Sequence, residues 1–373
     1  MEKMPTNRAA YLTKPLVTPF DVREAPYTPA KENQIVVKNH AVAINPIDWI
    51  IQSTPPGLSF QWLKYPFIMG SDVAGEVVEI GPGVTRFKVG DRVLGHAAGD
   101  DKSQNTPAQK GFQTYTVLLT YLTSKIPNNV SYDQASVLPL GCSTAACGLF
   151  EKDQLGLQLP AAPAARSTGK TVLIWGGSTS VGVNAIQLAA AAGYEVSTTC
   201  SPRNFDLVKR LGATEAYDYN SKTIVQDLTT AMQKRTLAGA LTAGRGGAEA
   251  FLQVFPKCTG NKVIAMANFP MPDPMPTRFV LPKIMFAFVS WTIAHKISLW
   301  RTGSSSNFIW GVPKPEGGVG QAVYEQFLPQ ALTKGSYTCA PEALVVGHGL
   351  ESLQAACDQQ KKGVSAKKLV VTL

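Results

Sequence analysis

The sequence lacks the features that mark several other classes of protein. Its six cysteines form no C-x-x-C pair and no tight cluster, which disfavours a disulfide framework and a cysteine-rich zinc site. No apolar run approaches the roughly twenty residues of a membrane-spanning helix, and the most apolar stretch, 284–294, has charged or titratable neighbours on both sides. The first residues include no apolar segment typical of a secretory signal. We therefore expect reduced thiols, no membrane span and a cytoplasmic location.

Charge is also sparse, at 16% of residues, and the net charge of +9 is spread along the chain. The densest basic clusters are the pairs 361–362 and 367–368, whereas a nucleic-acid footprint gathers on one element. This spread disfavours nucleic-acid binding and favours small anionic ligands such as cofactor phosphates. A length of 373 residues fits two domains of ordinary size.

What the chain does contain changes character along its length. Short strand patterns with glycine turns fill the first 140 residues and predict a small, barrel-like β domain. From Gly169 onward apolar strands alternate with helices, which predicts a parallel sheet covered on both faces, with further apolar runs at 261–268 and 295–300. The final "AKKLVVTL" reads as a strand, and we expect it to return to the first domain. The predicted fold class is α/β, a doubly wound parallel sheet inserted into a β-rich domain.

The stretch "TVLIWGGSTSVG" predicts a nucleotide-binding turn between a strand and a helix. Gly176 and Gly177 make the turn, and Gly182 lets the helix pack against its strand. Thr179 stands where such turns usually carry a glycine, and we expect Ser178, Thr179 and Ser180 to offer hydroxyls to phosphate oxygens. An ordinary strand–turn–helix without a ligand remains the alternative.

The end of the second strand predicts which dinucleotide binds. NAD-binding folds place an acid there for the ribose 2′-hydroxyl, but this chain has "CSPRNFD". Ser201, Arg203 and Asn204 offer donors that suit a 2′-phosphate. The loop therefore favours NADPH, with a solvated surface arginine as the alternative.

Taken together, five motifs in one order resemble the medium-chain dehydrogenase/reductase superfamily. They are "AVAINPIDWI", "GSDVAGEVVEIGPGVTRFKVGDRVLGH", "SVLPLGCSTAACGLF", "VLIWGGSTSVG" and "LGATEAYDY". Within it, "WGGSTS" and "APEALVVGHGLE" look most like the fungal zinc-independent branch of trans-acting enoyl reductases and quinone-oxidoreductase-like proteins. The resemblance implies a discontinuous GroES-like substrate domain, 1–140 plus 304–373, a Rossmann NADP-binding domain, 141–303, and a cleft between them. Zinc-dependent relatives have Gly-His-Glu at the position of Gly70-Ser71-Asp72, so no metal is expected.

The resemblance also implies the site residues. Asn45 and Asp48 are the catalytic candidates near the nicotinamide, although Asp48 alternatively caps the helix after Pro46, and Ile50 replaces a lysine of many relatives. The implied cofactor contacts are Asp48, Gly176, Gly177, Ser178, Thr179, Ser180, Val181, Gly182, Ser201, Arg203, Asn204, Tyr219, Met266, Ala267, Ser365 and Ala366. The implied substrate contacts are Cys142, Ser143, Thr144, Ala145, Ala146, Cys147, Gly148 and Phe286. Cys142 and Cys147 are alternatively core thiols.

The expected activity is NADPH-dependent, zinc-independent hydride transfer to the β carbon of an α,β-unsaturated carbonyl. We expect a hydrophobic enone or carrier-bound enoyl substrate from polyketide-like secondary metabolism, with a polyketide synthase as a possible partner and a monomer or homodimer as the assembly. The alternatives are a quinone or small-enone oxidoreductase and a non-redox accessory protein that binds NADPH. The histidines sit in no catalytic spacing and receive no role.

Overall fold

The computed structural model describes residues 5–54, 60–268 and 280–373, and the chain divides into two compact units. Unit 1 comprises Met1–Ser143 and Lys314–Leu373, and unit 2 comprises Thr144–Pro313. The first junction therefore lies inside helix α3 (Pro139–Phe150), and the second follows strand β15 (Ser305–Phe308). The predicted junctions lay at 140/141 and 303/304.

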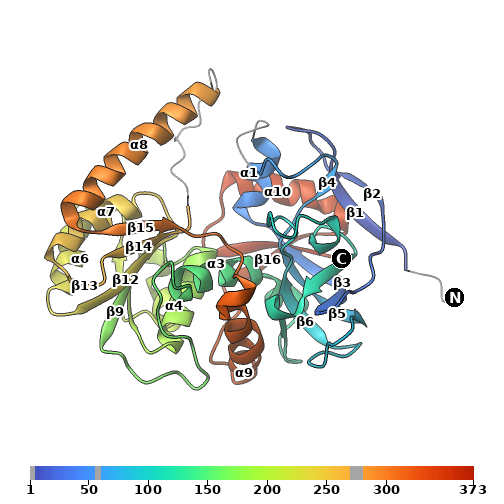
Figure 1. Cartoon of the computed structure of the whole chain (residues 1–373), viewed down its shortest axis with the longest axis horizontal. Helices are drawn as coiled ribbons and strands as arrows, with labels where there is room; N and C mark the ends of the chain where they lie inside the picture. Colours follow the sequence, from blue (N-terminus) through green and yellow to red (C-terminus); the bar gives the residue numbers. More distant parts are fainter. Residues whose placement is uncertain (1–4, 55–59, 269–279) are drawn as a thin grey trace. The chain divides into compact units, whose positions relative to one another are not determined.

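Unit 2 contains the doubly wound parallel sheet that the sequence predicts, and the fold class is confirmed (Figure 1). Its strand order is β11-β10-β9-β12-β14-β15, with β13 beside β12, which is the dinucleotide-binding arrangement of two mirrored halves. The strands are β9 (Lys170–Trp175), β10 (Glu195–Cys200), β11 (Glu215–Asp218), β12 (Thr236–Thr242), β13 (Thr259–Gly260), β14 (Val263–Met266) and β15. The helices are α4 (Ser180–Ala191), α5 (Phe205–Arg210), α6 (Ile224–Met232), α7 (Gly247–Val254) and α8 (Val280–Thr302).

One expected element of unit 2 is wrong. The apolar run at 295–300 does not belong to the sheet but lies within helix α8, and the outer strand is β15. Short apolar runs occur in both helices and strands, so apolarity alone does not separate the two. The helix extends over 23 residues, and the run is only part of its last turns.

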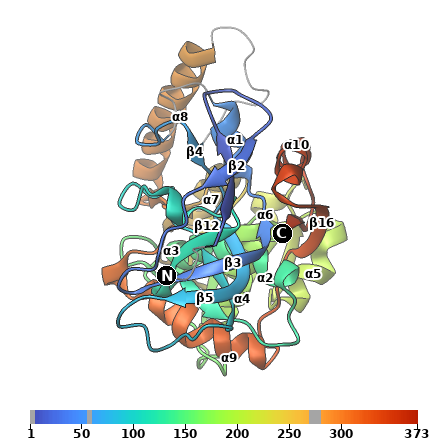
Figure 2. The ribbon, with the colours of Figure 1, turned by 90° about the vertical axis from the view of Figure 1, so that its right-hand side faces the viewer.

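Unit 1 is built from largely antiparallel sheets. The larger sheet has the order β16-β17-β3-β5-β6-β8, with β7 beside β3, and the smaller has the order β2-β1-β4. Figure 2 shows β3 and β5 side by side, an antiparallel pair. The last strand, β17, pairs antiparallel with β3, so the expected return of the chain's end to the first domain is confirmed.

The strands of unit 1 are β1 (Asn7–Leu12), β2 (Asp21–Ala25), β3 (Gln34–Ala43), β4 (Phe67–Ile68), β5 (Asp72–Ile80), β6 (Arg92–His96), β7 (Tyr115–Leu119), β8 (Thr123–Lys125), β16 (Glu342–His348) and β17 (Lys367–Thr372). Its helices are α1 (Pro46–Ser53), α2 (Tyr132–Ser136), the π-helical turn η6 (Gln321–Phe327), α9 (Leu328–Thr333) and α10 (Leu353–Lys362).

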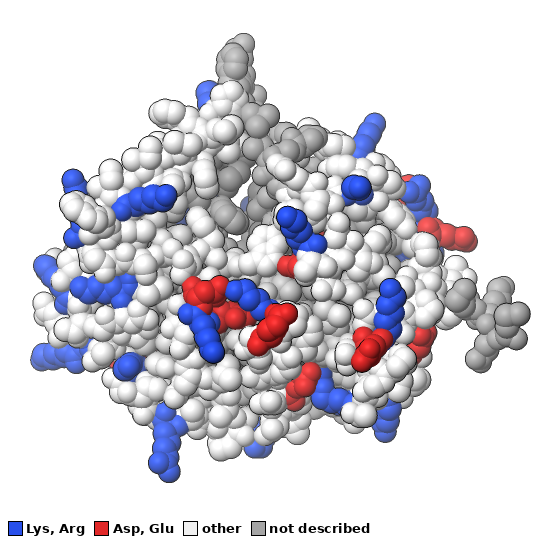
Figure 3. All heavy atoms as spheres, viewed as in Figure 1, with Lys and Arg blue, Asp and Glu red and all other residues white. Residues whose placement is uncertain are grey.

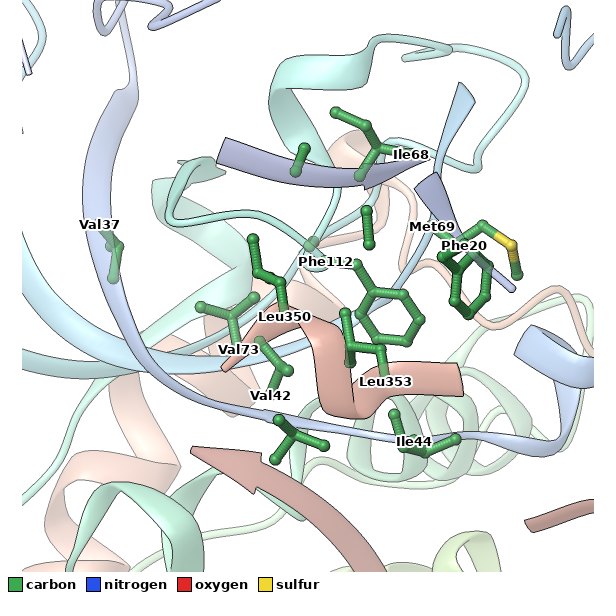
Figure 4. Close-up of a cluster of buried hydrophobic side chains, with 14 of the residues drawn as sticks. Phe20, Val37, Val42, Ile44, Ile68, Met69, Val73, Phe112, Leu350 and Leu353 are labelled. Atoms are coloured by element: carbon green, nitrogen blue, oxygen red, sulfur yellow. The ribbon is translucent and has the colours of Figure 1, made fainter. Parts of the chain in front are cut away.

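The core of unit 1 joins parts of the chain that lie far apart in sequence. Phe112, Val42 and Val73 from the first half of the chain lie in one buried cluster with Leu350 and Leu353 from its end (Figure 4). Burying side chains of this size stabilises by about 1.5–3 kcal/mol each. The C-terminal segment is therefore part of this core, which fixes β17 and the side chains that it carries.

Candidate functional site

The turn after β9 has the geometry of a phosphate-binding turn. Gly176 has φ +85°, a conformation that side chains rarely adopt. A Cβ on Gly177 would lie 2.2 Å from Thr198 Oγ1, and a Cβ on Gly182 would lie 2.2 Å from the carbonyl oxygen of Gly176. Only glycine fits these positions, and the first turn of α4 follows directly. The close backbone approach and the helix N-terminus fit a pyrophosphate.

Thr179 has a role that the sequence did not reveal. Its hydroxyl oxygen accepts the backbone N–H of Gly182 at 3.0 Å, and its single proton is donated to the carbonyl oxygen of Gly176 at 2.8 Å. Thr179 therefore caps α4. Its hydroxyl is committed to the turn itself, which leaves Ser178 and Ser180 as the hydroxyl donors expected to face a phosphate.

The loop after β10 carries the residues that the sequence assigned to the adenosine end. Ser201 Oγ lies 3.5 Å from the hydroxyl oxygen of Tyr219, so these two predicted residues are brought together. Arg203 is exposed on the short turn η3 (Pro202–Asn204), and Asn204 is buried beside it. No carboxylate stands between Cys200 and Phe205.

The remaining predicted contacts of unit 2 follow β14. Met266 is buried at the end of this strand, and the backbone N–H of Ala267 donates to the carbonyl oxygen of Thr242 at 2.8 Å. Because β9, β10, β12 and β14 are parallel, the glycine turn, the Ser201 loop and Ala267 all follow carboxyl ends at the same sheet edge. This edge is where dinucleotides bind in such folds.

Unit 1 contains a buried polar cluster at the start of β5 and β17. Lys368 Nζ lies 2.8 Å from Asp72 Oδ2, and the two side chains are 2% and 0% exposed. Asn45 joins them, since its Nδ2 donates to Asp72 Oδ2 at 2.8 Å and its Oδ1 accepts from Lys368 Nζ at 2.5 Å. The other oxygen of Asp72 accepts the backbone N–H of Leu140 at 2.5 Å. Every polar atom of the Asn45 side chain is thus held in one orientation.

Asp48 lies beside this cluster, and its contacts are those expected of a residue that caps α1. One carboxyl oxygen accepts the backbone N–H of Asn45 at 2.7 Å, at the first turn of α1. The other oxygen is buried and has no hydrogen-bond partner among the described residues. Burial raises the pKa of Asp48 to about 8, so a neutral carboxylic acid prevails at pH 7. Its catalytic role stays a prediction.

His96 begins a chain of buried hydrogen bonds in unit 1. Its Nδ1 lies 2.9 Å from Ser143 Oγ, which lies 2.7 Å from the Tyr324 hydroxyl, which donates to the carbonyl oxygen of Pro139 at 2.7 Å. The Tyr324 hydroxyl donates its one proton to the carbonyl oxygen of Pro139, so it accepts from Ser143. The Ser143 hydroxyl therefore donates to Tyr324 and accepts from His96. The direction of the chain places the histidine proton on Nδ1 and leaves Nε2 as an acceptor. Burial lowers the pKa of His96 to about 4, which keeps the ring neutral.

The other predicted contacts lie on three separate elements. Cys142–Gly148 is buried along its whole length in α3, and burial raises the pKa of the Cys142 thiol to about 12, as for a core thiol. Ser365 and Ala366 lie just before β17, where Ala366 has φ +52°. Phe286 lies on α8 and is 76% exposed. Within the described residues these substrate and tail contacts stay predictions.

Sequence reasoning missed Lys368, Asp72 and the chain through His96. A signal for Lys368 was present, because side chains alternate along a strand and adjacent lysines at the start of a buried strand cannot both face solvent. The buried one needs an acid. Tyr324 gave no local signal, since its partners are 181 and 185 positions away.

The described part of the chain lacks two further kinds of feature. No group of three or more His, Cys, Asp or Glu side chains there converges as a metal site. No helix in that part is long and apolar enough to cross a membrane.

Comparison with known proteins fixes the family. Residues 31–128 match the alcohol dehydrogenase GroES-like domain. The dehydrogenase pigH of Monascus ruber is 54% identical over 99% of this chain and 100% of its own length. The enoyl reductase component lovC of the lovastatin nonaketide synthase from Aspergillus terreus is 32% identical over 96% of this chain and 93% of its own.

Solved structures agree on the fold. An alcohol dehydrogenase superfamily protein from Novosphingobium aromaticivorans aligns with a TM-score of 0.72 at 22% identity, over 99% of this chain and 100% of its own. The sequence motifs, the Rossmann sheet, the GroES-like domain and these full-length relatives lead to one conclusion: the chain belongs to the medium-chain dehydrogenase/reductase superfamily, as an oxidoreductase of the enoyl-reductase-like type.

Proposed function

We propose that this protein is an NADPH-dependent reductase of a carbon–carbon double bond conjugated to a carbonyl. When bound, NADPH supplies the hydride that reaches the β carbon. The glycine turn and the α4 N-terminus hold the pyrophosphate, and Ser201, Arg203 and Tyr219 hold the adenosine end. The fold, the relatives and the glycine geometry support a nicotinamide cofactor.

The observation that carries the choice of NADPH is the loop after β10. An NAD-specific loop ends in an acid that binds the ribose 2′-hydroxyl and repels a 2′-phosphate. Here Ser201 and Tyr219 form a hydroxyl pair, Arg203 is exposed two residues after Ser201, and no carboxylate stands between Cys200 and Phe205. A planar guanidinium binds phosphate through two parallel hydrogen bonds.

The residues of unit 1 have a different task in this proposal. After hydride addition the α carbon needs a proton, and Asp48 is the candidate because burial raises the pKa of its carboxyl to about 8, which favours the protonated form. The ion pair of Lys368 and Asp72 fixes Asn45, whose backbone N–H fixes Asp48. Positioning of this kind, rather than strong acid chemistry, suffices for a reduction in which the cofactor supplies the reactive hydride.

We extend the proposal to the source of the substrate. The lovastatin relative is the enoyl reductase component of the lovastatin nonaketide synthase. An enoyl thioester on a carrier protein is therefore the substrate class that we expect, from secondary metabolism, with a synthase as the partner that supplies it.

Turnover of the purified chain tests the proposal. We expect oxidation of NADPH, followed by its absorbance, with a carrier-bound enoyl thioester and a reduced product that gains two hydrogens across the double bond. The saturated thioester is the matched control and should give no oxidation. Faster turnover of a free quinone would support the quinone-oxidoreductase alternative, and tight NADPH binding without oxidation by any acceptor would support the accessory protein.

A further inference from the structure

We propose that the outward face of α8 is a docking surface for an anionic lipid membrane. The inference is independent of the reaction proposed above. It concerns six side chains of unit 2, which we call the α8 apolar stripe: Met285, Phe286, Val289, Ile293, Ile297 and Trp300.

The opposite face of α8 is already occupied. Trp291 Nε1 donates to Glu249 Oε1 at 2.7 Å, and the Trp291 ring stacks on His295 with centroids 4.4 Å apart. His295 Nε2 lies 2.8 Å from Ser306 Oγ of β15, and Leu299 packs with Trp291 against the core of unit 2. Trp291, His295 and Leu299 are spaced four residues apart and form the inner face that packs α8 on unit 2. None of them belongs to the α8 apolar stripe.

The α8 apolar stripe continues along the other side of the same helix. Its members from Phe286 to Trp300 are spaced by three or four residues, so they share one face about 21 Å long. Phe286 is 76% exposed, Trp300 is 83% exposed, and the other members are close to half exposed or more. An aromatic side chain buries about 150–250 Å² when covered, so these two alone expose as much as the largest patch on many monomers.

The charges around the stripe select the occupant. Lys283, Lys296 and Arg301 are exposed on α8, and no Asp or Glu occurs in Val280–Thr302. Over α8, the face drawn in Figure 3 shows no acidic side chain. A second copy of the chain would bring this basic face against an identical basic face, since a two-fold contact pairs the same surface patch of both subunits. The favoured occupant is therefore apolar inside and anionic at its surface.

An anionic bilayer has that layout. Membrane-surface segments place Trp and Phe among the acyl chains and Lys and Arg at the headgroups, and the outward face of α8 offers both kinds of side chain. Basic side chains near such a surface are attracted to the anionic headgroups, and the attraction weakens as salt rises. The stripe would enter the interface while the inner face stays packed on unit 2.

Vesicle co-sedimentation of the full chain tests the proposal. We expect binding to phosphatidylcholine vesicles that contain phosphatidylserine, weaker binding to pure phosphatidylcholine, and loss at high salt. The triple change Phe286→Ser, Ile293→Ser and Trp300→Ser should lower the partition coefficient at least about tenfold. The triple change Lys283→Gln, Lys296→Gln and Arg301→Gln should lower it about a hundredfold on anionic vesicles only.

Matched controls and contrary results complete the test. Val89→Ser removes an exposed apolar side chain of unit 1, and Lys14→Gln with Lys64→Gln and Lys222→Gln removes three exposed cations elsewhere, so neither set should change binding. Absence of vesicle binding by the unaltered chain would overturn the proposal. Two further results would overturn it if no variant binds vesicles. In one, the stripe variant converts a dimer to a monomer, and in the other it loses binding of an acidic protein.

Discussion

Lys367 is exposed and its neighbour Lys368 is buried, so replacing each should lower the free energy of unfolding by a different amount. Lys368→Met leaves the Asp72 carboxylate buried without its cation, which should lower the free energy of unfolding by about 3–5 kcal/mol. Lys367→Met is the matched control, because its ion pair with Glu342 is exposed and should contribute at most about 1 kcal/mol. Denaturant unfolding measures both. An equal decrease in the free energy of unfolding for both variants would show that the buried ion pair stabilises the protein no more than the exposed one.

His96 is predicted to stay neutral, with its proton on Nδ1, down to a pH near 4. Nitrogen NMR of the labelled ring reports this tautomer directly. Because the folded-state pKa lies below the usual 6.5, its stabilising contribution is complete above pH 6.5 and declines as the pH falls toward 4. Ser143→Ala should weaken the preference for the Nδ1 tautomer. A ring that titrates near 6.5 in the folded protein would contradict the assignment.

The contribution of Asp48 to stability is predicted to change with pH in the opposite direction to that of His96. Its folded-state pKa is raised from 3.8 to about 8, so its contribution is complete below pH 3.8 and declines as the pH rises toward 8. Asp48→Asn cannot ionise, and its stability relative to the unaltered chain should therefore increase between pH 4 and pH 8. Thermal unfolding across this range measures the difference. A constant difference would mean that folding does not raise the pKa of Asp48.

At the scale of the element, the glycine turn and α4 were predictable and the role of Thr179 was not. Thr179→Ala should lower the free energy of unfolding by about 0.5–2 kcal/mol through loss of the helix cap. Thr179→Ser keeps the hydroxyl and should stay close to the unaltered protein. Urea unfolding compares the two variants. An unchanged Thr179→Ala would show that the hydroxyl does not stabilise the helix start.

The elements also show why part of the site escaped prediction. Strand and helix patterns repeat over a few residues, so β9, α4 and the returning β17 could be predicted from local sequence. The polar cluster joins Asn45, Asp72 and Lys368 across 323 positions of chain, and only the pairing of β17 with β3 brings them together. The prediction for 295–300 was wrong for a local reason, because an apolar segment of that length fits either a strand or a helix.

At the scale of the whole molecule, each unit contributes one part of the proposed chemistry. Unit 2 carries the glycine turn and the Ser201–Tyr219 loop, and unit 1 carries a buried polar cluster in which Lys368 and Asp72 fix Asn45. Full-length relatives fix the superfamily and the oxidoreductase class. The choice of NADPH over NADH rests on the loop after β10.

Calorimetric titration of both cofactors into the unaltered chain, Arg203→Ala and Arg210→Ala tests that choice most directly. The account predicts tighter binding of NADPH than NADH, and a loss of about ten- to a hundredfold for NADPH alone in Arg203→Ala, because a charged hydrogen bond to the 2′-phosphate disappears. Arg210 is an exposed arginine at the end of α5, and its removal should leave both affinities unchanged. Equal affinity of the unaltered chain for the two cofactors, or equal losses of both in Arg203→Ala, would contradict the account.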